Sequence, residues 1–266
     1  MRIFTRRVAS LFVFGLTAIA VANAQDCTNY DYKGLYSATV LGNFITPPPG
    51  VPAGPTARVG RVQVDGKGTA SIVTTLSLNG FVLQESYGGT YSIAPDCTAS
   101  VTLFIPFPGS PSPVPFQFSG MLADAGRVMN LILLNPQGTD VRIMLVKQRK
   151  LACNNGDLNG SYVLNETGTV IRGFLANPGP FARVGNIIFD GAGKFSAKVN
   201  ASYAGVVVPE TFAGTYSVNA DCSFTAAYAA NQASSWFGVL ADSSSGANII
   251  ESAGGSVITG TLTSVN

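Results

Sequence analysis

The sequence predicts an all-β protein made of two similar antiparallel β-barrels of about eight strands each, with β-sandwiches as the alternative. The phrase GTYSIAPDC at 89–97 returns as GTYSVNADC at 214–222, so the chain contains an internal repeat. Both halves hold runs in which apolar and polar residues alternate, as in half-buried strands. No stretch after residue 24 has the 3.6-residue period of an amphipathic helix.

Residues 1–24 have the features of a secretory signal peptide. Three arginines lie among the first seven residues, an apolar run follows from Leu11 to Val21, and Ala22-Asn23-Ala24 ends the segment. The apolar run is too short to favour a membrane-spanning helix. We therefore expect cleavage after Ala24 and an exported protein, periplasmic or extracellular.

The repeat extends over the remaining chain and predicts two homologous domains, 25–152 and 153–266. Most matching segments lie 125 or 126 residues apart, which indicates a duplicated domain, since a solenoid unit repeats every 20–50 residues. The last match lies 118 residues apart, so the second half has a shorter loop. Matching segments include ARVG at 57–60 and 182–185, DGKG at 65–68 with DGAG at 190–193, and GMLAD at 120–124 with GVLAD at 238–242.

The strands are expected in the same order in each half. The alternating runs 57–78 and 182–203 are each broken by Asp-Gly, which indicates a hairpin turn. Further strands in the first half are expected at 34–41, 87–93, 97–105, 115–123, 127–135 and 139–147. The proline-rich segments 47–55 and 106–115 cannot pair inside a sheet and are expected to be loops, at one barrel mouth or as surface spacers. A barrel is favoured over a sandwich because closure leaves no unpaired edge strands.

Four cysteines occupy matching positions, two in each half, which favours disulfides over metal binding or redox catalysis. Three pairings are possible. The duplication favours Cys27–Cys97 and Cys153–Cys222, because each domain can form that bond alone. Each bond would close a loop of about 70 residues.

The composition excludes several classes of function. The chain has no histidine, which removes the usual Ser-His-Asp and Cys-His nucleophiles and the commonest metal ligand. No phosphate-binding or dinucleotide-binding motif is present, so we expect no cofactor and no metal. Loss of the signal peptide leaves 13 basic against 14 acidic residues, a net charge of −1, with no basic stripe for nucleic acid. The sequence does not predict an oligomeric state.

One arginine and one glutamate per half are in phase with the apolar face of their strands, because residues two apart share a face. Buried charges should pair, either to fix strand register or as a polar handle at the bottom of a ligand pocket. In the second interpretation, the carboxylate could also transfer a proton if its pKa is raised. The candidate lumen residues are Arg58, Glu85, Tyr87 and Tyr91 in the first half and Arg183, Glu210, Phe212 and Tyr216 in the second.

Short motifs in both halves give a resemblance to known barrels. Gly34-Leu35-Tyr36 and Gly160-Ser161-Tyr162 resemble the Gly-x-aromatic start of the calycin group of lipocalin-like barrels. The order R-x-G, D-G-x-G, G-T-Y-S, D-C also resembles bacterial exported domains with an allene-oxide-cyclase-like barrel. This resemblance implies a barrel that holds an apolar molecule. It matches no catalytic motif, so it assigns no catalytic residue.

Three functions are compatible with these features. The favoured one is a non-catalytic protein that binds small hydrophobic or amphipathic molecules in its barrel cavities. The second is a structural or surface-interaction module whose barrels are filled by side chains. The third is a cyclase-like or isomerase-like enzyme in which Glu85 or Glu210 acts as acid or base. The sequence favours a non-enzymatic function without deciding it, and it does not identify a ligand.

Overall fold

The fold is described from a computed structural model that covers seven segments of the chain. These are residues 26–47, 50–106, 112–148, 151–172, 178–229, 235–241 and 246–265. The expected signal peptide, 1–24, and parts of both proline-rich loops lie outside the described residues.

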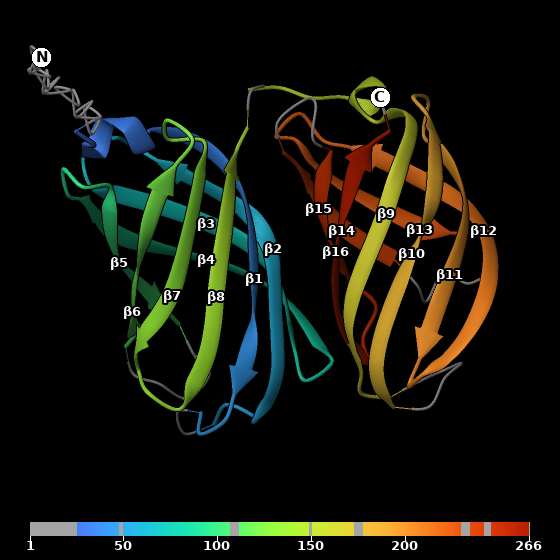
Figure 1. Ribbon diagram of the computed structural model, residues 1–266, viewed down its shortest axis with the longest axis horizontal. Coiled ribbons are helices and arrows are strands. Elements are labelled where there is room, and N and C mark those ends of the chain that lie inside the picture. The colour runs from blue at the N-terminus through green and yellow to red at the C-terminus, as the bar shows by residue number, and fades with distance from the viewer. Residues whose placement is uncertain are drawn as a thin grey trace, which may run out of the picture.

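The described chain forms two closed eight-stranded antiparallel barrels that lie side by side (Figure 1). Barrel 1 consists of β1 (Gly34–Phe44), β2 (Gly54–Val64), β3 (Thr69–Leu78), β4 (Phe81–Ile93), β5 (Thr98–Ile105), β6 (Val114–Ala123), β7 (Val128–Asn135) and β8 (Thr139–Lys147). Barrel 2 consists of β9 (Asn159–Val170), β10 (Gly179–Asp190), β11 (Lys194–Tyr203), β12 (Val206–Val218), β13 (Ser223–Tyr228), β14 (Ser235–Leu240), β15 (Ala247–Glu251) and β16 (Ser256–Ser264). The predicted all-β class and the preference for barrels over sandwiches are confirmed.

Strand positions agree with the expectations, with extensions at several ends. The strand expected at 34–41 continues to Phe44. The expectation that 47–55 and 106–115 are loops is wrong at their last residues, because Pro55 and Pro115 pair within the first two residues of β2 and β6, where a strand tolerates proline. The segment 139–147 is a strand over its full predicted length, whereas the strand expected at 87–93 begins six residues earlier, at Phe81. This extension exists because Asn79-Gly80 forms a two-residue turn between β3 and β4. Both turn residues have positive φ, 49° and 81°, which Asn and Gly tolerate best. The Asn-Gly pair is the signal that would have predicted the longer strand.

The Asp-Gly segments form hairpin connections as predicted. Between β2 and β3, the Asp65 carboxylate accepts hydrogen bonds from the backbone N–H groups of Lys67, Gly68 and Thr69 at 2.7–3.0 Å. These bonds lower the pKa of Asp65. Gly66 has a φ of 76°, which a residue with a side chain adopts only with strain. Asp190 forms the equivalent turn in barrel 2.

A disulfide and a short 3-10 helix lie at the upper end of each barrel (Figure 1). The bonds are Cys27–Cys97 and Cys153–Cys222, so the predicted pairing is confirmed. The helix η1 (Asn29–Tyr32) buries Tyr32 against Tyr36 and Tyr91, with ring centroids 4.7 and 5.1 Å apart. The helix η2 (Asn155–Asp157) holds the same place in barrel 2. Two disulfides fit an oxidising compartment.

The barrels contact each other through the outer faces of β1–β3 and β14–β16. Apolar side chains from both barrels form a separate buried cluster there, which contains Ala57, Val59, Val239, Ile250 and Val257. Polar bonds surround this cluster. The Asn248 amide donates to the Ser37 hydroxyl at 2.8 Å, and the Gly255 N–H donates to the Gly80 carbonyl at 2.8 Å. Arg61 and Asp221 form an ion pair across the same junction.

None of the helices in the part of the chain described here has the length and hydropathy needed to cross a bilayer.

Candidate functional site

The predicted charge pair of barrel 1 is present in the lower half of its lumen. Arg58 Nε lies 3.0 Å from Glu85 Oε2, and the two side chains are 4% and 11% exposed. A second guanidinium nitrogen, Nη2 of Arg58, has no hydrogen-bond partner among the described residues. Tyr87 adjoins the pair, and its burial raises the pKa of its hydroxyl. Arg58, Glu85 and Tyr87 therefore converge as the strand phase predicted.

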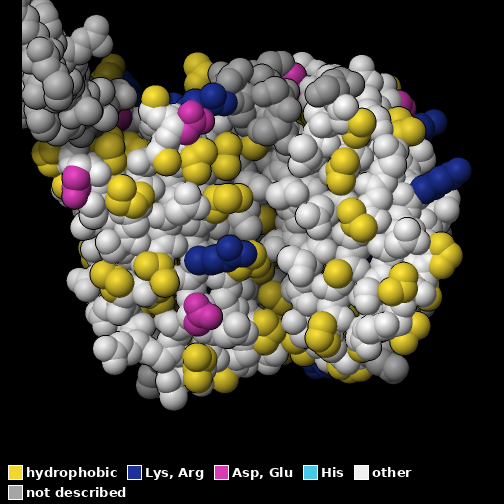
Figure 2. Space-filling view, viewed as in Figure 1, with side chains coloured by type: hydrophobic (Ala, Val, Ile, Leu, Met, Phe, Trp, Pro, Cys, Tyr) yellow, Lys and Arg dark blue, Asp and Glu magenta, His cyan; other side chains and the backbone are white. Residues whose placement is uncertain are grey.

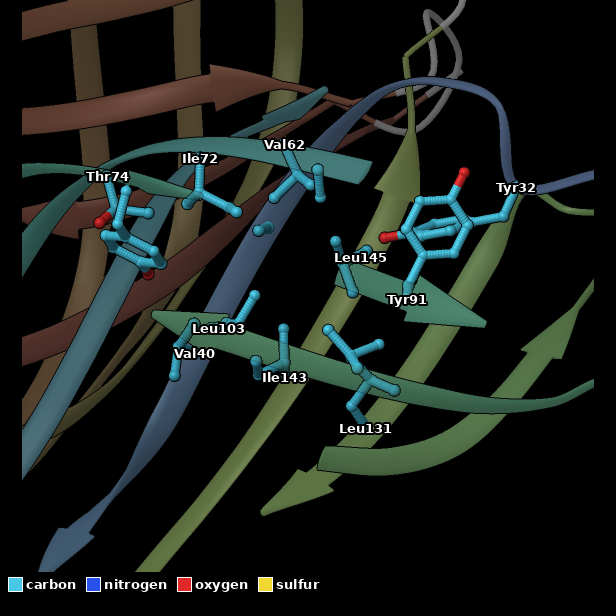
Figure 3. Close-up of a pocket in the computed structure, with 14 residues that line it drawn as sticks. Tyr32, Val40, Val62, Ile72, Thr74, Tyr91, Leu103, Leu131, Ile143 and Leu145 are labelled. Carbon is cyan, nitrogen blue, oxygen red and sulfur yellow. The ribbon is translucent and has the colours of Figure 1, made fainter. Parts of the chain in front are cut away.

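The lumen of barrel 1 is mostly filled by side chains. Figure 3 shows its apolar cavity, with aliphatic side chains around it, Thr74 at one end and Tyr32 and Tyr91 at the other. This cavity has a volume of about 30 Å³, and a second one beside Arg58 and Tyr87 has about 20 Å³. A water molecule needs roughly 10–15 Å³ of such space, whereas pockets for drug-sized ligands measure about 300–1,000 Å³. Each cavity therefore has room for only one or two water molecules.

Two of the candidate residues lie away from the charge pairs. The Tyr91 hydroxyl lies at the disulfide end, 3.4 Å from Asp65 Oδ1, although its ring lines the cavity. The Tyr216 hydroxyl donates to the Leu158 carbonyl at 2.7 Å at the same end of barrel 2. Both hydroxyls thus bond residues that close the barrel. They do not join the polar groups lower in the lumen.

Barrel 2 contains a larger network around Arg183. Its Nη1 lies 3.0 Å from Glu166 Oε2, and its Nη2 lies 3.1 Å from Glu210 Oε2. Arg183 also donates to the hydroxyls of Tyr228 and Tyr203 at 3.1 and 3.3 Å, and Tyr203 donates to Glu210 at 2.7 Å. The predicted Arg183–Glu210 pair is therefore present, and Glu166 binds the same guanidinium. Glu166 is 1% exposed and Glu210 is 25% exposed, so the network reaches solvent on the Glu210 side.

The network lies against aromatic rings, and the Arg183 guanidinium stacks over two of them. Its carbon is 5.1 Å from the ring centroid of Phe181 and 5.3 Å from that of Phe212. Phe212 packs in turn on Tyr228 at 4.7 Å, and Tyr228 packs on Trp236 at 5.1 Å. Tilted and edge-on aromatic rings thus pack beside the charged groups in the described part of the lumen.

A third carboxyl, that of Glu251, belongs to the same region. It is buried at the end of β15 and accepts a hydrogen bond from the Ser235 backbone N–H at 3.2 Å. Burial, and then the charge of Glu166, raise the pKa of Glu251 to about 8. Burial also raises the pKa of Glu166, against the opposing effects of Arg183 and the indole N–H of Trp236. We therefore expect Glu251 to be protonated at neutral pH.

Sequence reasoning missed four of these residues: Glu166, Tyr203, Tyr228 and Glu251. Strand register gives their equivalents in barrel 1, which are Val40, Leu78, Leu103 and Leu133. For example, Glu166 pairs with Arg183 as Val40 pairs with Arg58. Glu166 lies at every second position with Tyr162 and Leu164, so it shares their buried face. This alternation is the sequence signal that could have identified Glu166. Because aliphatic residues fill the same positions in barrel 1, the fold does not require these polar groups.

No group of three or more His, Cys, Asp or Glu side chains that could hold a metal ion occurs within the described segments. The carboxyls of barrel 2 are instead bound by a guanidinium, by hydroxyls and by backbone N–H groups.

Comparisons with known proteins assign no family to the chain. No protein-family model and no curated protein sequence matches it. Among solved structures, a protein of unknown function from the DUF3598 family of Nostoc punctiforme aligns over 90% of this chain and 99% of its own, at 14% identity and a TM-score of 0.26. A similarity at that TM-score supports no conclusion about activity.

Proposed function

We propose that this protein is an exported, non-catalytic module that works through the outer surface of two rigidly joined, filled barrels. The volume of the barrel 1 lumen carries the proposal. The cavities described there measure about 30 and 20 Å³, and the rings of Phe195, Phe212, Tyr228 and Trp236 pack edge-on or tilted inside barrel 2. These volumes favour the second of the three functions that the sequence allows.

The outer surface supports the same proposal. On barrel 1, Met121, Ile132, Leu134 and Met144 project from the adjacent strands β6, β7 and β8 and form what we term the outer patch. Ile132 and Leu134 are 57% and 59% exposed. Figure 2 shows groups of hydrophobic side chains across the visible face of both barrels, with few charged groups between them. Asn130 lies between Met121 and Met144, and Arg142 lies next to Ile132. Exposed apolar side chains grouped on one face in this way are typical of surfaces that bind another protein.

Two variants, each with two substitutions in β7, distinguish a function of the outer surface from a function of the lumen. Ile132→Ser with Leu134→Ser changes the outer patch, and Leu131→Ala with Leu133→Ala changes side chains of the same strand that face the lumen. We expect proteins cross-linked to the wild type in its own host to be lost with the outer-patch variant and kept with the lumen variant. The opposite pattern would contradict a surface function.

Ligand binding in barrel 1 is the second candidate, and one observation favours it. Arg58 Nη2 is a buried donor without a hydrogen-bond partner in the described segments, next to the cavity shared with Tyr87. A neutral molecule with a carbonyl or hydroxyl oxygen would satisfy it without adding charge. Native mass spectrometry of the protein from its own host tests this candidate. A reproducible adduct of a few hundred daltons, lost on denaturation, would establish binding, whereas the bare disulfide-bonded mass would favour filled barrels.

A further inference from the structure

Barrel 2 buries more carboxyl groups than one guanidinium can neutralise. Glu166 and Glu210 share Arg183, while Glu251 has the backbone N–H of Ser235 as its partner. One oxygen of Glu166 and the indole N–H of Trp236, both buried, form no hydrogen bond of regular geometry with any residue that the structure describes. A second buried negative charge beside Glu166 would therefore lack a counter-ion, which is costly in a low-dielectric interior.

Glu251 lies at the lower end of barrel 2, so a charge on its carboxyl would act on the strand ends there. Glu251 is the last residue of β15, and its carboxyl binds Ser235, the first residue of β14. The neighbouring Ser252 adds a backbone bond of 2.7 Å to the Ser235 carbonyl and a hydroxyl contact of 2.8 Å. The disulfide and the rings of Phe189, Phe195 and Phe224 hold the other end of the barrel.

From this geometry we propose that barrel 2 contains a pH-sensitive latch, in which the proton on Glu251 keeps the junction of β14, β15 and β16 closed and its loss opens that end. Glu251 pairs across the strands with Trp236, which packs on Tyr228, and Tyr228 in turn accepts a hydrogen bond from Arg183. The groups that act on the charge of Glu251 are Glu166 from β9, Arg183 from β10 and Tyr228 from β13, together with the backbone N–H groups of Ser235 and Ala253. Arg183 is the one cation among them, and Glu166 and Glu210 already bind it. Ionisation of Glu251 thus adds a second negative charge that Glu166 repels.

The direction of the pH dependence follows from the raised pKa. A carboxyl whose pKa is higher in the folded state stabilises the fold at low pH, and this contribution is lost as the pH rises toward that pKa. For Glu251 the loss extends from its ordinary value of 4.5 to about 8. Burial also raises the pKa values of the Tyr203 and Tyr228 hydroxyls, so these groups do not ionise in this range.

Opening of the latch would also affect the contacts of barrel 2 with barrel 1. The turn between β15 and β16 binds the turn between β3 and β4 through Gly255 and Gly80, and the Ser77 hydroxyl donates to the Ser256 carbonyl at 2.6 Å. In Figure 1, the β3–β4 hairpin extends toward barrel 2 at this level. A change at the lower end of barrel 2 would therefore shift contacts between the barrels.

Trp236 is the only tryptophan of the chain and lies in the network, so its fluorescence reports on the latch. The experiment is acrylamide quenching of the intact protein between about pH 6 and pH 9.5. We expect the quenching constant to rise several-fold, with a midpoint near the pKa of Glu251, about 8, while the far-ultraviolet circular dichroism is retained. Hydrogen exchange should increase over the same range in β14 and β15 and remain slow in β11.

Two variants test the assignment to Glu251. Glu251→Gln keeps the shape without the charge, and Glu251→Leu copies Leu133 of barrel 1. Both should keep Trp236 protected across the whole pH range. Glu85→Gln in barrel 1 is the matched control and should retain the transition. The proposal is overturned if wild-type quenching does not change with pH, or if the transition persists in both Glu251 variants.

Discussion

At the scale of single residues, the two barrels contain the same Arg–Glu pair in different surroundings. Arg58 and Glu85 are enclosed by aliphatic and aromatic side chains, whereas Arg183 binds two carboxylates and two tyrosine hydroxyls. In barrel 1, the contribution of the Arg–Glu pair to stability can therefore be measured without the additional carboxylate and hydroxyls that bind Arg183. A buried pair of this kind is expected to cost little when both partners are replaced and much when one is removed.

A double-mutant cycle in barrel 1 tests this expectation. Arg58→Met leaves the Glu85 carboxylate nearly buried without a counter-ion and should lower the free energy of unfolding by about 3–5 kcal/mol. Arg58→Met with Glu85→Leu should recover most of this loss. Urea unfolding of the wild type, the single variants Arg58→Met and Glu85→Leu, and the double variant measures the coupling. If the double variant is as unstable as Arg58→Met, the pair contributes to stability beyond the mutual neutralisation of its two charges.

The carboxyl of Glu251 should also set the pH dependence of overall stability. Because its pKa is raised from 4.5 to about 8, its stabilising contribution is present in acid, is lost progressively as the pH rises between these values, and is absent at higher pH. Glu251→Leu should therefore raise the urea midpoint most at alkaline pH and leave a smaller difference in acid. Equal shifts at both pH values would show that packing, not charge, separates the variant from the wild type.

At the scale of elements, the hairpin turns and the disulfides hold the strands in register. Asp65 fixes its turn through three backbone N–H groups, and these lower the pKa of its carboxyl. Its stabilising contribution is present above the ordinary value of 3.8 and is lost as the pH falls below it. Asp65→Ala should therefore lower the urea midpoint at neutral pH and have a smaller effect in strong acid.

The two disulfides close loops of nearly equal length, with sequence separations of 70 and 69 residues. On the chain-entropy estimate, each contributes roughly 4 kcal/mol by restricting the unfolded chain. Cys27→Ser with Cys97→Ser and Cys153→Ser with Cys222→Ser should therefore destabilise their own barrels by similar amounts. Calorimetry of both variants measures the losses. A loss in one barrel much smaller than in the other would show that the two barrels differ in how strongly they depend on the bond.

At the scale of the whole molecule, the apolar cluster between the barrels should make them behave as one unit. Ile250 is fully buried in that cluster, whereas Ile132 projects from the outside of barrel 1. Ile250→Asp should separate the barrels, enlarge the radius of gyration in X-ray scattering and split unfolding into two steps. Ile132→Asp adds the same charge without burying it and should leave both measurements unchanged. A compact Ile250→Asp protein would show that the polar bonds alone hold the barrels together.

The sequence by itself determined the two barrels, the disulfide pairing and the Arg–Glu pairs. These features depend on the repeat and on the period of two along a strand, and both can be read locally. Only the tertiary structure decided how full the lumens are and which further side chains meet Arg183. Glu251 lies 68 residues from Arg183, and strand closure brings them together. The lumen volume depends on how side chains from eight strands pack together, so no local sequence pattern predicts it.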